Sequence, residues 1–112
     1  MKIYHNPRCS KSRSTLQIIE DAGKEVEIVE YLKNTPTADE LRSILSKLGM
    51  RAEEIIRKGE LAYKENFKGK DLTDEEWISA MIEFPKLIER PIVVKGDKAV
   101  IGRPPENVKG LF

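Results

Sequence analysis

The segment at residues 4–13 constrains this chain more than any other, because it holds the only cysteine and the only histidine at a strand-to-helix junction. Residues 1–4 form a short apolar run typical of a strand, and an Asn-Pro pair interrupts it. The following helix is indicated by apolar residues at spacings of three and four: Leu16, Ile18, Ile19 and Ala22, before Gly23. The junction predicts Cys9 at or just before a helix N-terminus, where Ser10 or Ser12 is available to cap free backbone N–H groups.

Cys9 lies among groups that favour its ionised form. A helix N-terminus carries roughly half a positive charge, and nearby cations also lower the pKa of a thiol from its free value of about 8.5. Arg8, Lys11 and Arg13 supply such cations, and His5 offers a proton donor or an orienting hydrogen bond. A lone cysteine is more often a small buried hydrophobe, but this one has polar and charged neighbours. We therefore predict a reactive thiolate, with His5 either tuning its pKa or making a structural hydrogen bond.

The composition is that of an ordinary soluble protein. Its 112 residues suit a single domain with one modest core. A net charge of +1 does not indicate a nucleic acid or an anionic membrane as partner, and no apolar run approaches the roughly 20 residues that span a bilayer. No signal peptide is expected. One cysteine and one histidine fall short of a metal site, and a lone thiol beside a histidine favours a cytoplasmic protein.

The order of predicted elements indicates an α/β fold. The opening strand, the helix after Cys9 and a second strand over 26–31 form a βαβ unit, which places two parallel strands in one sheet. A hairpin over 92–101, with Gly96 leading a type II′ turn, and a last helix over 106–109 end the chain. Two segments of the middle region carry the Thr-x-x-Glu signature of a capping box. Helices are predicted there over 37–48, 51–58 and 73–84, and residues 60–71 are predicted as either loop or frayed helix.

Three blocks of the sequence resemble the glutaredoxin-linked arsenate reductase family. They are residues 5–13, 89–94 and 101–104, which occur in order and with similar spacing over essentially the whole chain. The element order and the resemblance together imply an α/β, thioredoxin-like mixed sheet in a single domain, 1–112, with a helical insertion at about 37–88. In such folds a cis-proline precedes the third strand and faces the reactive cysteine, and Pro91 holds that position.

The resemblance assigns roles to particular residues. Cys9 matches the nucleophile that forms a covalent thiol–arsenate adduct, and His5 and Ser12 match residues that favour the thiolate. A tetrahedral anion with two negative charges suits guanidinium groups, which bind oxygens bidentately. Lys11 and Arg13, close to the cysteine, are further candidates for binding the substrate. The three arginines that the resemblance places around the oxyanion are Arg57, Arg90 and Arg103.

The resemblance also implies glutathione as a co-substrate that attacks the adduct and glutaredoxin as the partner that resolves the mixed disulfide, with no bound cofactor. Ser12 makes the motif CxxS, so an internal disulfide relay is excluded and an external thiol is required. The first hypothesis is therefore a monomeric, cytoplasmic arsenate reductase. The alternative is a thioredoxin-fold regulator or adaptor of a protein such as RNA polymerase, and a third possibility is the same chemistry on another small molecule. Thr15 stands where cysteine-dependent phosphatases require an arginine, which excludes that class.

Overall fold

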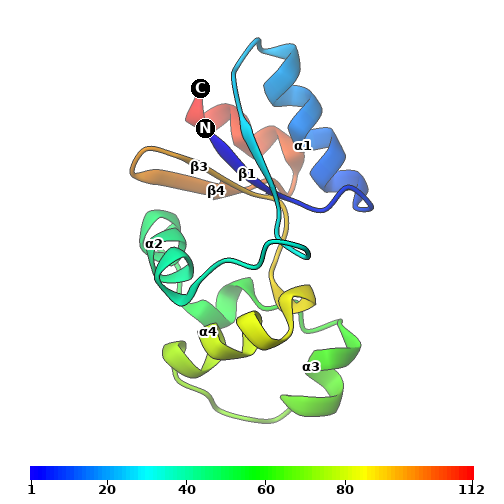
Figure 1. The fold of residues 1–112 in the computed structure, drawn as a ribbon, viewed down its shortest axis with the longest axis vertical. Helices are drawn as coiled ribbons and strands as arrows, with labels where there is room; N and C mark the ends of the chain where they lie inside the picture. Colours follow the sequence, from blue (N-terminus) through cyan, green and yellow to red (C-terminus); the bar gives the residue numbers. More distant parts are fainter. The chain divides into compact units, whose positions relative to one another are not determined.

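The structure, a computed structural model, describes residues 1–112, and its elements are drawn in Figure 1. The chain divides into two compact units, Met1–Asn34 with Arg90–Phe112, and Thr35–Glu89, here named the sheet unit and the helical unit. The sheet unit contains β1 (Lys2–His5), α1 (Ser10–Asp21), β2 (Glu27–Glu30), β3 (Ile92–Lys95), β4 (Lys98–Ile101) and the 3₁₀-helix η3 (Pro105–Leu111). The helical unit contains α2 (Ala38–Leu48), the 3₁₀-helix η1 (Ala52–Ile55), α3 (Leu61–Asn66), α4 (Asp74–Glu83) and the 3₁₀-helix η2 (Pro85–Leu87).

The sheet has four strands in the order β2-β1-β3-β4. Strands β1 and β2 run parallel, with Ile3 opposite Ile28, as the βαβ pattern predicts. Strand β3 pairs antiparallel with β1, where Val93 lies opposite Ile3, and with β4, where Val93 lies opposite Val100. The predicted α/β, thioredoxin-like fold with a mixed sheet is therefore confirmed.

The core of the sheet unit forms where one face of the sheet meets α1 and η3. Ile3 and Val93, which are direct cross-strand partners, are fully buried in one apolar cluster with Ile19 of α1. Val108 and Leu111 of η3 belong to the same cluster. Helices α1 and η3 contact each other, and Figure 1 shows both at the same side of the sheet. This packing fixes α1, so that its N-terminal end lies where β1 ends.

The hairpin of β3 and β4 has the predicted two-residue loop, Gly96 and Asp97. Gly96 has a φ of 61°, and no residue other than glycine has a positive φ. A type I′ turn needs positive φ at both loop residues, so the observed angles agree with the predicted type II′ turn. The peptide bonds that precede Pro91 and Pro104 are both cis, and the first of these matches the expectation for the proline before β3.

Two helices of the helical unit begin with the predicted capping boxes. Thr37 Oγ1 accepts a hydrogen bond from Glu40 N–H, and Thr73 Oγ1 accepts one from Glu76 N–H, both at 3.2 Å. In each box the glutamate side chain accepts a hydrogen bond from the threonine N–H in return. Helix α2 ends at Gly49, which has a φ of 67°. That these helices form an insertion, at about 37–88, in a single domain stays a prediction.

The predicted helix over 51–58 is wrong in its second half. The 3₁₀-helix η1 ends at Ile55, and Ile56 forms an isolated antiparallel bridge with Ile88. The N–H of Arg57 then donates to a carbonyl of η2 at 2.8 Å. These partners replace the carbonyls that a helix would have supplied, so Arg57 belongs to an extended segment and not to a helix C-terminus.

Two other segments differ from the prediction in extent. Helix α3 occupies Leu61–Asn66, inside the region predicted as loop or frayed helix, and the last helix is a longer 3₁₀-helix, Pro105–Leu111. Among all the helices, none combines the length and the apolar character needed to cross a membrane.

Candidate functional site

The junction between β1 and α1 places Cys9 at the N-cap of α1, as predicted. Its backbone is extended, with φ −94° and ψ 123°, and its carbonyl accepts the first helical hydrogen bond from Arg13 N–H at 3.0 Å. The N–H of Cys9 donates to Asn6 O at 3.0 Å and closes the turn. The free thiol is only partly buried, so a reactant in solvent can reach it.

Ser12 joins the end of β1 to the first turn of α1. Its Oγ accepts a hydrogen bond from the backbone N–H of Asn6 at 3.0 Å and lies 2.6 Å from His5 Nδ1. Ser12 is fully buried, and His5 is only 6% exposed. The N-cap of α1 has no side-chain capping bond, so the expectation that Ser10 or Ser12 caps this helix is wrong. The hydroxyl of Ser12 instead satisfies a loop N–H and orients the imidazole.

The surroundings of His5 favour the neutral form of its imidazole. Burial lowers the pKa of His5, and the charge of Arg13 lowers it further, whereas Glu30 and Glu20 act in the opposite direction. The net pKa lies below the ordinary value of about 6.5. This turn therefore favours a neutral ring beside the buried hydroxyl of Ser12.

The thiol of Cys9 is stabilised as a thiolate. Partial burial raises the pKa of Cys9, but four other groups outweigh it and bring the pKa below its ordinary value. They are the backbone N–H groups of Ser12 and Lys11, the charge of Arg90 and a hydrogen bond from Arg103. The two backbone groups belong to the first turn of α1, which contains no acidic residue. The helix end and the arginines thus act together on the sulfur.

Arg90 and Arg103 flank the hairpin that ends near Cys9. Arg103 Nη1 lies 3.9 Å from Cys9 Sγ, a long hydrogen bond, and donates to Arg90 O at 3.3 Å. One arginine precedes β3 and the other follows β4, and Ile92 lies opposite Ile101 where these strands meet. The antiparallel pairing therefore brings the two arginines to the same end of the hairpin. The structure unites Cys9, Arg90 and Arg103, while their role toward an oxyanion stays a prediction.

Lys11 and Arg13 are exposed residues of the first turn of α1. Arg13 Nη1 donates to Pro7 O at 2.9 Å, which braces the loop before Cys9. Lys11 acts on the sulfur of Cys9 through its backbone N–H. The contacts of both side chains with a substrate stay predictions.

Arg57, the third predicted arginine, lies in the helical unit. Its Nη2 is 3.2 Å from Glu60 Oε2, and its side chain is 21% exposed. Its Nη1 also lies 3.4 Å from Lys86 O. Arg57 therefore has an acidic partner within its own unit, and its role around an oxyanion stays a prediction.

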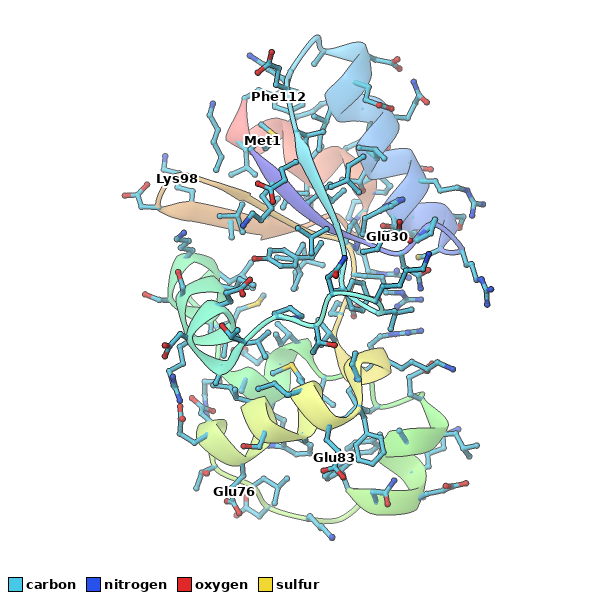
Figure 2. All side chains as sticks on the ribbon, viewed as in Figure 1. Met1, Glu30, Glu76, Glu83, Lys98 and Phe112 are labelled. Carbon is cyan, nitrogen blue, oxygen red and sulfur yellow. The ribbon has the colours of Figure 1, made fainter.

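A hollow of about 280 Å³ opens beside the loop that leads to Cys9. It lies at the carboxyl ends of the parallel strands β1 and β2, where α/β proteins commonly bind ligands. The sequence analysis did not predict this hollow, although the expected βαβ unit and the usual place of ligand sites in α/β proteins would have indicated it. Figure 2 shows Glu30 near the start of α1, and Lys33 Nζ lies 3.7 Å from Glu30 Oε1. The residues that line the hollow are His5, Asn6, Pro7, Arg8, Glu30, Leu32 and Lys33.

Comparison with known proteins finds relatives over the whole chain. The ArsC family model matches residues 4–111. The uncharacterized protein YfgD of Escherichia coli (strain K12) is 53% identical over 110 residues, covering 96% of this chain and 92% of its own. An arsenate reductase of Haemophilus influenzae is 47% identical over 108 residues, covering 95% of this chain and 93% of its own. The solved structure of an arsenate reductase from Vibrio cholerae matches with a TM-score of 0.94 at 43% identity, covering 100% of this chain and 98% of that chain.

Proposed function

This chain belongs to the ArsC family, and from that membership and the geometry around Cys9 we propose that it reduces arsenate to arsenite. The observation that carries the proposal is the environment of one sulfur. Cys9 lies at the N-terminus of α1, Arg103 Nη1 is 3.9 Å from its Sγ, and the charge of Arg90 lowers its pKa. The thiolate is the nucleophilic form of cysteine, and the same positive charges attract a doubly negative oxyanion.

In the first step the Cys9 thiolate attacks arsenic. An S–As bond forms, and one arsenate oxygen is protonated and leaves as water. Arg90 and Arg103 bind the remaining oxygens through charge-assisted hydrogen bonds. Because the nucleophile and the substrate are both anions, this positive charge is needed to bring them together and to stabilise the transition state.

Glutathione is the proposed reductant, because Cys9 is the only cysteine and cannot form an internal disulfide. The glutathione thiol attacks the Cys9 sulfur, the S–As bond breaks, and its electron pair stays on arsenic, which passes from As(V) to As(III). Two thiols have then each lost one electron and are joined as a mixed disulfide, which glutaredoxin reduces. The hollow beside the loop presents Arg8 and Lys33, two cations suited to the carboxylates of this peptide.

The test is arsenite production from arsenate with glutathione and glutaredoxin. We expect turnover by the wild type, none by Cys9→Ser, and a loss of about 10²–10³-fold in Arg90→Ala, the usual effect of removing one donor that stabilises a transition-state charge. Arg42→Ala is the matched control. Arg42 Nη2 lies 2.7 Å from Glu75 Oε1 on the surface of the helical unit, so its loss should leave turnover at the wild-type level.

A wild type that produces no arsenite would overturn this proposal. If Cys9 were still glutathionylated readily, the regulator or adaptor of a protein partner, or the same thiol chemistry on another small molecule, would take its place. Reactions that lack glutaredoxin, or in which dithiothreitol replaces glutathione, separate the choice of reductant from the choice of substrate.

A further inference from the structure

Thr15 is a buried residue of α1 that the proposed chemistry does not use. It is fully buried, and only His5 and Ser12 among other polar or charged residues are also buried. The hydroxyl of Thr15 donates to Lys11 O at 2.8 Å, an ordinary bond between a threonine and the carbonyl one turn earlier. The same oxygen lies 3.3 Å from Gly102 O. Thr15 therefore links the first turn of α1 to the segment that follows β4.

Gly102 packs against Thr15 more closely than a residue with a side chain could. A Cβ at Gly102 would lie 2.4 Å from Thr15 Oγ1, 2.9 Å from Thr15 Cγ2 and 2.8 Å from Pro91 Cγ. The N–H of Gly102 also donates to Pro91 O at 3.0 Å. Arg103 follows Gly102 in the chain, and Arg90 precedes Pro91. Gly102, which Thr15 contacts, is thus joined to both arginine-bearing segments.

We propose that Thr15 is a positioning residue, which through its hydroxyl and its packing on Gly102 holds Arg103 within hydrogen-bonding distance of Cys9. The contact between Arg103 Nη1 and Cys9 Sγ is long, at 3.9 Å. A small outward shift of residue 102 is therefore enough to break it. The N–H groups of Ser12 and Lys11, which also act on the sulfur, belong to α1 itself and do not depend on this contact.

The inference rests on the proposed function only for the identity of Cys9 as the nucleophile, because the thiol can be measured without arsenate. Thr15→Val tests it, since valine has nearly the same shape but no hydroxyl. The measurement is the pH profile of the rate at which iodoacetamide alkylates Cys9. In Thr15→Val the midpoint should move to higher pH, and the rate at pH 7 should fall by about three- to tenfold, as one lost hydrogen bond would cause. Thr15→Ser should keep the wild-type midpoint.

A residue that only stabilises the fold would change the urea midpoint and leave the alkylation profile in place. Ser14→Val is the matched control, because it adds valine at an exposed neighbouring position of α1, and its profile should equal that of the wild type. The route through Arg103 is tested in an Arg103→Ala background, where Thr15→Val should cause no further shift.

An unchanged profile in Thr15→Val, or an equal shift in the Arg103→Ala background, would overturn the proposal. Thr15→Ala replaces the valine variant, under the same criteria, if the valine variant does not fold. If the wild type did not reduce arsenate, these alkylation results would still hold. The proposed arsenate reduction and the positioning role of Thr15 can therefore fail independently.

Discussion

The helices of this protein begin in two different ways. Helices α2 and α4 each begin after a threonine that makes a complete capping box, and their first turns are acidic: Asp39 and Glu40 in α2, and Asp74, Glu75 and Glu76 in α4. Figure 2 shows Glu76 at the start of α4. Helix α1 begins at Cys9, without a side-chain capping bond and without an acidic residue in its first turn. The short helix α3 also begins without these features, but among the helices of ten or more residues only α1, which carries the thiol, lacks them.

This difference separates stability from reactivity. The first N–H groups of a helix lack partners within it, and capping side chains and nearby acidic residues stabilise that end. At α1 the same features would place a competing acceptor or a negative charge where a thiolate must form. The N–H groups of Ser12 and Lys11 instead lower the pKa of Cys9. The fold therefore caps α2 and α4, which take no part in the proposed chemistry, and leaves the end of α1 for the sulfur.

Cys9→Ser should have the largest effect, and in two directions. Without the thiol, arsenate turnover and glutathionylation should both disappear. Serine is a good N-cap residue, so the free energy of unfolding of Cys9→Ser should exceed that of Cys9→Ala by about 0.5–1 kcal/mol. Arsenite production and urea unfolding measure the two properties. If the serine and alanine variants unfold at the same urea concentration, the end of α1 cannot accept a cap and the contrast with α2 and α4 does not hold.

Thr73→Ala should show what a capped helix end loses. Removing the hydroxyl leaves the N–H of Glu76 without its partner, and the free energy of unfolding should fall by about 1 kcal/mol. Thr73→Ser, which retains the hydroxyl, is the control and should stay close to the wild type. Because no thiol chemistry involves this helix end, the arsenite produced per folded molecule should be unchanged. A loss of turnover without a loss of stability would contradict this division between the two kinds of helix end.

The capped ends are also the parts that the sequence predicts best. The starts of α2 and α4 and the end of α2 at Gly49 depend on residues within a few positions of one another, so a local pattern is sufficient. The position of Cys9 at a helix start was predictable for the same reason. The partners of Ser12 were not, because they depend on how the end of β1 packs beside α1, and the hydroxyl meets Asn6 and His5 there.

Long-range partners explain the other differences. The second half of the helix predicted over 51–58 does not form, because Ile56 pairs with Ile88. No residue near Ile56 in the sequence indicates this distant partner. Thr15 and Gly102 are 87 positions apart, and their close approach follows only from the packing of α1 against the end of β4. Arg90 and Arg103 were predicted by their matching blocks. Their approach to Cys9 results from the antiparallel pairing of β3 with β1 and with β4, which brings the start of β3 and the end of β4 beside the end of β1.

Lys11→Glu should give α1 the acidic first turn that α2 and α4 have, with a smaller effect than the two substitutions above. A negative charge near the helix N-terminus should raise the free energy of unfolding by about 0.3–1 kcal/mol at low salt. The same charge disfavours a thiolate, so the pKa of Cys9 should rise and its alkylation at pH 7 should slow. Lys11→Gln is the control that removes the positive charge only. An acidic variant that is more stable and equally reactive would show that charge at this end does not act on the sulfur.

The smallest expected effect is a pH dependence confined to the turn before α1. Because burial lowers the pKa of His5 in the folded protein, the unfolded chain binds a proton first as the pH falls below about 6.5. Stability is therefore complete above that pH, declines as the pH falls through the folded pKa, and levels off below it. A Cys9→Ala background removes the titration of the thiol, and His5→Gln in that background should abolish the decline.

The caps of the helical unit supply the comparison for this measurement. Hydrogen bonds from Thr73 lower the pKa of Glu76 below the ordinary value of a glutamate, so this carboxylate stays ionised from pH 8 to about 5. The destabilisation caused by Thr73→Ala should then be the same at both pH values, while the Cys9→Ala protein with His5 intact loses stability between them. Urea unfolding at the two pH values measures both. If the protein with His5 is equally stable at both, the imidazole is not held neutral by burial, and the turn before α1 is as insensitive to pH as the capped ends of α2 and α4.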